Sequence, residues 1–327
     1  MKLRHVPPAV LLAGALAVSA PASALTSPGA TASVLFGGTL PLMAKEGTLG
    51  VRLGVVRMYW TLPHLGARTA LKVIAGHRAV LASIDVPRGG PSYARIAAGA
   101  EDATVLPFLR TLAAASRSAG VPLFVAFQHE ADSPRDQALG TPARFTAAWD
   151  HLHALAARAR LNAAQGGPVR WALILMHWAY FPYSDPARPR WSRYLGWAGN
   201  YWPGAGEADY AAADGYDRGG CMLSASDVPT RPAVSPQFVF GPAVTFAAHR
   251  GVPLIVAEWG ANWYPGDPSF QPAFIGLMQS WVTANAGNLA AVSYFDTPDS
   301  GSAYCNAPVN GHPTSLSALA RMARAMP

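Results

Sequence analysis

The sequence predicts a single (β/α)8 barrel, and three observations support that prediction. Eight short apolar runs of strand character are spread along the 327-residue chain. Amphipathic, helix-like segments lie between several of these runs, and strands that alternate with helices form parallel sheets. Two of the runs, Leu123–Glu130 and Leu254–Trp259, have a glutamate at or next to their last residue. A carboxylate there has no packing role, but the carboxyl ends of barrel strands are where active sites are assembled.

The eight predicted strands are mostly continuous apolar stretches, which suits parallel strands that are covered on both faces. In chain order they span Ala32–Leu40, Val55–Trp60, Ala79–Ile84, Leu123–Glu130, Trp171–Trp178, Tyr210–Asp217, Leu254–Trp259 and Ala290–Asp296. The link between the first two carries little helix signal, so we expect an irregular start to the barrel.

Apolar residues recur at helical spacing in five of the intervening segments. These predicted helices span Thr104–Ala119, Thr141–Arg160, Phe240–Arg250, Phe270–Ala286 and Leu316–Ala325. Gly120 and Gly251, each followed by Val-Pro, are typical helix stops. The segment Tyr180–Asp209 has no periodicity, and loops of that length are usually functional. We find no repeat or linker, and therefore expect one domain over residues 25–327.

The first 24 residues have the pattern of a signal peptide. Lys2 and Arg4 precede an apolar run that is too short to span a bilayer, and Ala22-Ser23-Ala24 matches a cleavage site. We therefore expect cleavage after Ala24 and a secreted protein without membrane insertion. The formal net charge is +7, but the arginines are scattered without a run or stripe. This distribution does not favour nucleic-acid binding, and we expect a monomer.

Two carboxylates at the ends of two barrel strands can face each other across a substrate, as glycoside hydrolysis requires. Glu130 and Glu258 are the candidates for that pair. A metal hydrolase is not favoured, because the fourth residue beyond His129 is Ser133 rather than a second histidine. We expect neither a metal nor another cofactor.

Several short motifs, in this order and spacing, resemble glycoside hydrolase family 26, a family of retaining (β/α)8 enzymes. The similarity extends from about residue 50 to the C-terminus. The motifs are His129-Glu130, Gly140–Phe145 with Ala148-Trp149, Trp202-Pro203-Gly204, Ala213–Asp217, Phe240–Ala243 and Ala257-Glu258-Trp259-Gly260.

The resemblance implies Glu130 as the acid/base and Glu258 as the nucleophile. It also implies His129 as a neighbour that orients the site and Tyr216 as a hydrogen-bond donor to the nucleophile. The expected substrate is a β-linked polysaccharide, of the β-mannan type first, with β-1,3-xylan and mixed-linkage β-glucan as alternatives. Ala131–Pro134 departs from the polar-aromatic segment that mannanases of the family have there, which leaves the sugar open. A carbohydrate-binding barrel that has lost catalysis is the alternative function.

Sugar rings stack on aromatic side chains through their apolar faces. Aromatic residues at or just after predicted strand ends are therefore candidate substrate contacts: Trp60, Trp178, Trp259, Trp263 and Tyr294. We expect His177 to donate a hydrogen bond to the substrate. Arg57, near the end of the second predicted strand, could hold a carboxylate or a sugar hydroxyl, although a surface role would fit it nearly as well.

Cys221 and Cys305 are the only cysteines. An even pair in an exported protein indicates a disulfide. The two residues follow the sixth and the eighth predicted strands, and so lie on loops at the same face of the barrel. We expect a bridge that fixes two rim loops on either side of the strand that carries Glu258.

Overall fold

The computed structural model describes residues 33–134, 136–182, 197–204, 206–221, 226–297, 305, 307–309 and 311–326. The described residues all belong to one compact unit. The expected signal peptide lies outside the described residues.

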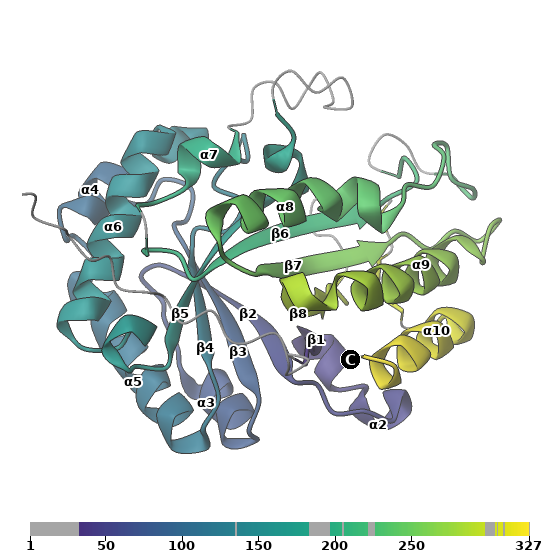
Figure 1. The fold of residues 1–327 in the computed structure, drawn as a ribbon, viewed down its shortest axis with the longest axis horizontal. Helices are drawn as coiled ribbons and strands as arrows, with labels where there is room; N and C mark the ends of the chain where they lie inside the picture. Colours follow the sequence, from purple (N-terminus) through teal and green to yellow (C-terminus); the bar gives the residue numbers. More distant parts are fainter. Residues whose placement is uncertain are drawn as a thin grey trace, which may run out of the picture. The chain divides into compact units, whose positions relative to one another are not determined.

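Eight parallel strands form a closed barrel in which each strand pairs with its neighbours in chain order, and β8 pairs with β1 (Figure 1). The prediction of a (β/α)8 barrel is therefore confirmed. The strands are β1 (Leu35–Thr39), β2 (Val55–Thr61), β3 (Ala79–Asp85), β4 (Leu123–Phe127), β5 (Val169–Met176), β6 (Tyr210–Asp217), β7 (Leu254–Ala261) and β8 (Leu289–Tyr294).

The helices lie outside the barrel (Figure 1). Two single-turn helices, α1 (Leu40–Met43) and α2 (Glu46–Leu49), fill the link from β1 to β2, as the weak helix signal there indicated. The remaining α-helices are α3 (Arg68–Ala75), α4 (Tyr93–Ala97), α5 (Asp102–Ala119), α6 (Pro142–Arg158), α7 (Ala198–Tyr201), α8 (Pro236–Arg250), α9 (Phe270–Asn285) and α10 (Pro313–Arg324). The five predicted helices are all present, and the short α3 and α4 were not predicted.

Local chemistry explains where the longer helices begin and end. The Thr141 hydroxyl accepts a hydrogen bond from the Arg144 amide and caps α6, and the Ser235 hydroxyl caps α8 by accepting from Phe238. Because Ser235 is the cap, α8 begins at Pro236, four residues before the predicted Phe240. Gly120 and Gly251 have φ of 68° and 69°, so both predicted helix stops are left-handed glycine caps.

Two apolar layers stabilise the barrel. The larger layer fills the space between strands and helices, and the smaller one lies inside the barrel. The interior layer includes Val55, Leu81, Phe124, Ala172 and Ile255, which come from the first halves of their strands. Inward positions further along the strands are polar: Arg57 follows Val55 by two residues, and Ser83 follows Leu81 by two. The barrel therefore closes on apolar side chains at one end and presents polar ones at the other.

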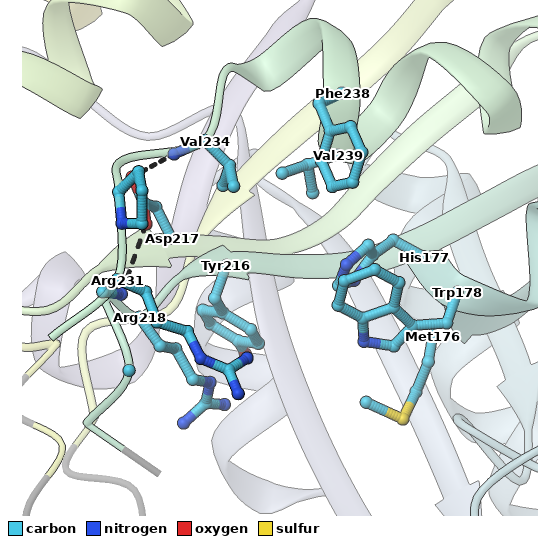
Figure 2. Close-up of a pocket in the computed structure, with 13 residues that line it drawn as sticks. Met176, His177, Trp178, Tyr216, Asp217, Arg218, Arg231, Val234, Phe238 and Val239 are labelled. Atoms are coloured by element: carbon cyan, nitrogen blue, oxygen red, sulfur yellow. Dashed lines mark hydrogen bonds between the residues drawn. The ribbon is translucent and has the colours of Figure 1, made fainter. Parts of the chain in front are cut away.

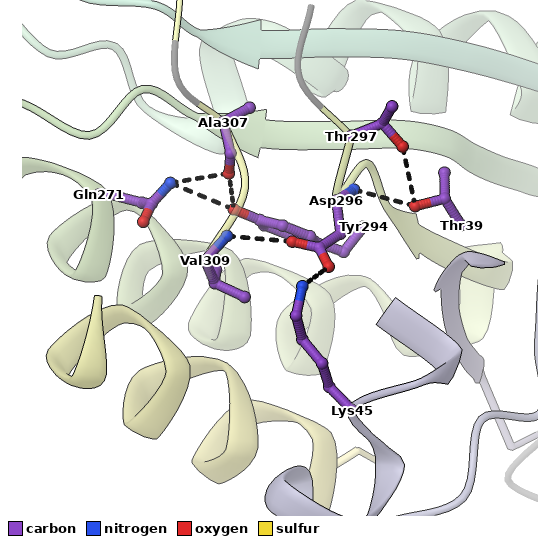
Figure 3. Close-up of polar contacts among 8 residues, drawn as sticks. All are labelled: Thr39, Lys45, Gln271, Tyr294, Asp296, Thr297, Ala307 and Val309. Atoms are coloured by element: carbon purple, nitrogen blue, oxygen red, sulfur yellow. Dashed lines mark hydrogen bonds and ion pairs between the residues drawn. The ribbon is translucent and has the colours of Figure 1, made fainter. Parts of the chain in front are cut away.

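A polar network joins the segment after β8 to the end of β1 and to the link between β1 and β2 (Figure 3). The buried Asp296 carboxylate forms an ion pair with Lys45 and accepts a hydrogen bond from the Val309 amide at 3.0 Å. The Asp296 amide donates to the Thr39 hydroxyl at 3.2 Å. These contacts fix the seam where β8 meets β1, together with the segment around Val309.

Four predicted strands end two or three residues away from the observed end. β7 continues to Ala261 and β8 stops at Tyr294, and β4 and β5 stop early for local reasons. β4 ends at Phe127 rather than Glu130, because Gln128 and Glu130 have left-handed φ values of 50° and 55°. β5 ends at Met176, where the chain enters a short 3₁₀ helix, η3 (His177–Tyr180). Across the described part of the chain, no helix is long and apolar enough to span a bilayer.

Candidate active site

Polar side chains from β2, β6 and β7 meet at the carboxyl end of the barrel. Residues two apart in a strand share a face, so Arg57 and Tyr59 of β2 both face the interior of the barrel. Asp214 and Tyr216 do the same on β6. Glu258 on β7 contacts residues of both strands. These three strands thus place four polar side chains around the Glu258 carboxylate.

An irregularity in β7 directs Glu258 into the barrel. Ala213 pairs with Val256, but the next residue, Asp214, pairs with Glu258, so one residue of β7 is left over. Ala257 belongs to the apolar interior of the barrel. Without the extra residue, strict alternation would send Glu258 to the opposite face. The bulge therefore allows Ala257 and Glu258 to face the same interior.

The Glu258 carboxylate is 6% exposed and accepts from three donors. The Tyr59 hydroxyl donates to Oε1 at 2.7 Å, and Arg57 Nη2 lies 3.4 Å from the same oxygen. The Tyr216 hydroxyl donates to Oε2. Hydrogen bonds and a positive charge of this kind favour the ionised form of a carboxyl group.

Arg57 is held in place on two sides. Its Nη1 donates to the Ser83 hydroxyl at 2.7 Å, and its guanidinium lies 4.4 Å from the centre of the Tyr59 ring. The side chain is fully buried. Arg57 is thus a buried partner of Glu258 and not a surface residue.

Asp214 is the nearest neighbour of Glu258 in the β6–β7 pairing, and it differs from Glu258 in its surroundings. It is 1% exposed, and neither of its carboxyl oxygens has a hydrogen-bond partner among the described residues. Burial, and after it the charge of Glu258, raises the pKa of Asp214 well above its usual value. Burial therefore favours the neutral form of Asp214.

Glu130 lies in the turn after β4. Its amide donates to the Ile174 carbonyl at 3.0 Å, and its carbonyl accepts from the Ser133 amide at 2.7 Å. The charge of Glu130 raises the pKa of both Asp214 and Asp132. Since Glu258 also raises the pKa of Asp214, both glutamates lie within electrostatic range of that residue.

Asp132 is a second buried acid near Glu130. It is 1% exposed, and its Oδ1 accepts from the Met176 amide at 3.1 Å. Burial raises its pKa well above the usual value. Its carboxyl group links the turn after β4 to the end of β5.

His129 is bound to an aspartate at the end of β3. Its Nδ1 lies 2.8 Å from Asp85 Oδ1, which also accepts from the His129 amide at 3.2 Å. Burial lowers the pKa of His129, but the charge and hydrogen bond of Asp85 outweigh it and raise the pKa to about 9. The imidazole is therefore positively charged at neutral pH, with its ring 5.4 Å from that of Tyr59.

A cavity of about 540 Å³ adjoins this cluster and shares Tyr216 with it (Figure 2). The partly exposed Trp178 lines one side of it, and His177 lies behind. His177 Nδ1 lies 3.3 Å from the Asp214 carbonyl, and burial lowers its pKa to about 3. Because the neutral His177 ring donates through Nδ1, its Nε2 can only accept a hydrogen bond. The sequence analysis expected His177 to donate one to the substrate.

Three aromatic residues expected to contact sugar are packing residues instead. Trp259 and Tyr294 have no exposed surface and pack edge to face, with ring centres 4.8 Å apart. Trp60 is 8% exposed, packs on Phe108 and donates to the Gly66 carbonyl at 2.7 Å. All three belong to the apolar layer between strands and helices.

Trp263 remains partly exposed after β7, and its ring stacks on His312 with centres 3.9 Å apart. The expected disulfide is present: Cys221 after β6 is bonded to Cys305, with 5.3 Å between the Cα atoms.

Two residues of the site were not singled out from the sequence. Tyr59 could have been found from the spacing Arg57-x-Tyr59, which places both side chains on the interior face of one strand. Asp214 was part of a quoted motif, but nothing in the sequence indicated a buried acid without a partner.

The fold and this cluster define a (β/α)8-barrel protein with buried acids at the carboxyl ends of its strands. No protein-family model matches the sequence, and no curated protein matches it. Solved structures do match. A GH26 β-mannanase from Bacteroides ovatus has a TM-score of 0.58 and 13% identity, over 90% of this chain and 89% of that one.

An endo-β-1,4-mannanase from Thermotoga petrophila has a TM-score of 0.57 and 12% identity, over 90% of this chain and 77% of that chain. Fungal β-1,4-galactanases match with a TM-score of 0.53 and 15% identity, over 88% of this chain and 94% of theirs. These similarities confirm the fold that the resemblance to glycoside hydrolase family 26 implies.

Proposed function

We propose that this protein is a retaining glycoside hydrolase that cleaves a β-linked polysaccharide, with Glu258 as the nucleophile and Glu130 as the acid/base. The observation that supports this most directly is the environment of Glu258. It is a buried carboxylate at a strand end, and three donors favour its ionised form. A side chain that attacks an anomeric carbon must be ionised before the reaction begins.

In the proposed first step, Glu258 forms a bond to the anomeric carbon while the bond from that carbon to the leaving oxygen breaks. Glu130 donates its proton to the leaving oxygen. In the second step, Glu130 takes a proton from water, and that water displaces Glu258 from the sugar. Retention requires the two carboxyl groups to be roughly 5–5.5 Å apart.

The neighbouring residues have distinct roles in this proposal. Tyr59, Tyr216 and Arg57 hold Glu258 in one orientation and stabilise its charge. His129, charged and fixed by Asp85, orients the turn that carries Glu130. Burial and the charges of both glutamates raise the pKa of Asp214, so that it does not add a third negative charge.

The finer assignments are proposals as well. Mannanases and a galactanase among the structural neighbours, together with the family 26 resemblance, favour a β-mannan, and β-1,3-xylan and mixed-linkage β-glucan are the alternatives. Export as a monomer after cleavage at Ala24 agrees with a disulfide-bonded chain, because disulfides persist in oxidising compartments.

Site-directed variants test the catalytic pair. Glu258→Gln and Glu130→Gln should each reduce hydrolysis of the preferred polysaccharide by about 10³-fold or more, while the fold is retained. Only Glu130→Gln should recover activity on aryl glycosides with activated leaving groups, since these need no protonation. Glu101→Gln, at the N-terminus of α5, is the control and should keep full activity.

The assay measures reducing ends released from β-mannan, β-1,3-xylan, mixed-linkage β-glucan and β-1,4-xylan. Binding of one of these by the unaltered protein without any release would favour a non-catalytic binding barrel. Full activity in both glutamine variants would exclude the proposed pair. An inverted product anomer in NMR would contradict the retaining mechanism.

A further inference from the structure

Two tyrosines donate to the Glu258 carboxylate, and each of them has an arginine against its ring. Tyr59 donates to Oε1 and Tyr216 donates to Oε2, so each carboxylate oxygen has its own hydroxyl donor. Arg57 Cζ lies 4.4 Å from the centre of the Tyr59 ring. Arg218 Cζ lies at the same distance, 4.4 Å, from the centre of the Tyr216 ring (Figure 2). The same arrangement of arginine, tyrosine and carboxylate oxygen therefore occurs twice at this site.

The two arginines differ in how they reach the carboxylate. Arg57 Nη2 lies 3.4 Å from Glu258 Oε1, so this guanidinium acts on the carboxylate directly. Arg218 contacts the Tyr216 ring instead. An effect that passes from Arg218 to Glu258 by this contact must pass through the Tyr216 hydroxyl.

The main chain fixes the position of Arg218. Its carbonyl accepts hydrogen bonds from the Tyr264 hydroxyl at 2.6 Å and from the Cys221 amide at 3.0 Å. Gly219 and Gly220 follow with φ of 52° and 96°, so the chain turns immediately after Arg218 in a conformation that favours glycine. The residue is thus held between the end of β6 and a tight turn, which keeps its side chain beside the Tyr216 ring.

The contact with Arg218 suits a tyrosine that donates a hydrogen bond. A guanidinium within about 6 Å of a ring centre is attracted by the negative face of the ring. Burial, and after it the charge of Glu258, raises the pKa of Tyr216 well above its usual value, so the hydroxyl keeps its proton. The charge of Arg218 acts on this pKa in the opposite direction, which makes the hydroxyl a stronger donor.

We propose that Arg218 is a positioning residue for the hydrolysis: its guanidinium packs against the Tyr216 ring and holds the Tyr216 hydroxyl on Glu258 Oε2. The inference rests on the proposed function, in which Glu258 is the nucleophile. It requires only that the guanidinium stay against the ring, whatever its N–H groups bind. Loss of this contact should leave the ring free to tilt and weaken a hydrogen bond that orients the attacking carboxylate.

Kinetics of two Arg218 variants of the full-length chain test the proposal. Arg218→Met removes the charge and keeps a side chain of similar reach. We expect kcat on the preferred polysaccharide to fall by about tenfold, which is within the range that cation–π contacts span. KM should change by less than about twofold, because the interaction lost is with the donor to Glu258 and not with the substrate. Arg218→Lys keeps a positive charge near the ring and should restore kcat to within about threefold of the unaltered protein.

A double-mutant cycle separates positioning from a general structural role. Tyr216→Phe removes the hydroxyl, so in that background Arg218→Met should lower kcat by less than about twofold further. Arg250→Met is the matched control. Arg250 is an exposed residue at the end of α8, its Cζ lies 5.1 Å from the centre of the Phe246 ring, and its loss should leave kcat unchanged. Thermal denaturation of each variant checks that the fold is retained.

NMR of the protein labelled with ¹³Cζ-tyrosine tests the contact without any need for turnover. The Cζ signal of a tyrosine responds to the hydrogen bond of its hydroxyl, and Tyr216→Phe and Tyr59→Phe assign the two signals. Arg218→Met should move the Tyr216 signal and leave that of Tyr59 in place. Arg250→Met should move neither signal.

Full kcat in Arg218→Met would overturn the proposal, as would an equal loss of kcat with and without the Tyr216 hydroxyl. A higher KM at unchanged kcat would also overturn it, since Arg218 would then contact the substrate. An unmoved Tyr216 signal would overturn it whether or not the protein hydrolyses a polysaccharide. A moved signal in a protein that hydrolyses none would refute the proposed function instead, and would support the link from Arg218 to the Tyr216 hydroxyl.

Discussion

Glu258 and Asp214 are neighbours across two paired strands, yet their surroundings differ. Glu258 has three donors, including a buried guanidinium, whereas neither oxygen of Asp214 has a partner among the described residues. Burial, and after it the charge of Glu258, raises the pKa of Asp214 well above its usual value. The donors that surround Glu258, and that Asp214 lacks, are the reason to propose Glu258 as the nucleophile.

The contribution of one of these donors can be measured. Tyr216→Phe removes the hydroxyl that donates to Glu258, and a hydrogen bond to a charged group contributes about 1.5–3 kcal/mol. We expect kcat to fall by roughly 10- to 100-fold with little change in thermal stability. Tyr93→Phe is the control, since the buried Tyr93 hydroxyl has no partner in the described chain. Equal loss of activity in both variants would show that Tyr216 acts through packing.

The contact between Asp85 and His129 leads to a testable prediction about the charge of His129. Asp85→Asn removes the group that raises the pKa of His129, and the burial that remains should bring that pKa from about 9 to below its ordinary value of about 6.5. NMR titration of the His129 ring measures this directly. Asp102→Asn, at the remote His151 pair, should leave the His129 titration unchanged.

The same pair predicts a pH dependence of stability. A histidine whose pKa is raised on folding stabilises the protein fully below its unfolded value, about 6.5, and loses that effect as pH rises through about 9. The free energy of unfolding should therefore decline between these values, and less so in His129→Gln. An identical decline in this variant would assign the effect to other groups.

Sequence reasoning singled out Glu258, Arg57 and His129, which lie at the carboxyl end of the barrel, because charged residues within apolar runs stand out. It failed for Trp259 and Tyr294, because a position near a strand end does not say which face a side chain takes. In β7 the bulge makes that question harder still, since alternation counted from Ile255 gives the wrong face for Glu258. In a strand with a bulge, the face that each residue takes depends on how the strand pairs with its neighbour. The sequence of one strand does not contain that information.

At the scale of elements, the existence of strands and longer helices was predictable, and several of their ends were not. β4 and β5 end earlier than predicted, where the backbone turns to place Glu130 and His177. After β5 the sequence stays largely apolar through η3, whereas Gln128-His129-Glu130 after β4 are polar, and neither pattern marks the point where the backbone turns. The α4 helix, Tyr93–Ala97, is too short for a clear period of 3.6 residues, whereas α3 buries Ala70, Val73 and Ile74 at helical spacing, a signal that was overlooked.

The contact of β6 with α8 depends on a residue without a side chain. A Cβ on Gly215 would lie 2.5 Å from Val239 Cγ1 and 2.9 Å from Phe240 Cε1, closer than atoms can approach. Gly215 lies between Asp214 and Tyr216, so a shift of the strand there would also displace both of these residues. The strand and the helix therefore pack closely because this position is glycine.

Gly215→Ala should destabilise the protein by about 1–3 kcal/mol and lower kcat, because overpacking moves α8 or β6. The control is Gly276→Ala in α9, where an added Cβ meets nothing within 4 Å and a better helix former should add up to about 1 kcal/mol. Chemical denaturation compares the two variants. Equal stability of Gly215→Ala and the unaltered protein would mean that α8 can move without cost.

At the scale of the whole barrel, closure was predictable from eight runs in one chain, since neighbouring strands of a parallel barrel follow chain order. The contacts that hold β8 against β1 were not predictable from the sequence. The ion pair of Lys45 with Asp296 joins residues 251 apart in sequence (Figure 3). Such a partner is visible only once the fold brings β8 back to β1.

The disulfide acts at this same scale. It joins the loop after β6 to the segment after β8, closing 84 residues of chain. By loop-closure entropy, a cross-link of this length stabilises the fold by about 4.5 kcal/mol at most, through the unfolded state. For a protein of this size that corresponds to a loss of about 5–10 °C in melting temperature when both cysteines are replaced.

Replacement of both Cys221 and Cys305 by serine should therefore lower the melting temperature of the exported protein. If the bridge also fixes the loops on either side of β7, the variant should show a lower kcat/KM at temperatures where it is fully folded. Thiol titration of the denatured, unreduced protein should find no free thiol. Two thiols per chain in freshly exported material would show that the bridge does not form. An unchanged melting temperature would show that the loops are held by their other contacts, among them the Tyr264 hydroxyl that donates to the Arg218 carbonyl at 2.6 Å.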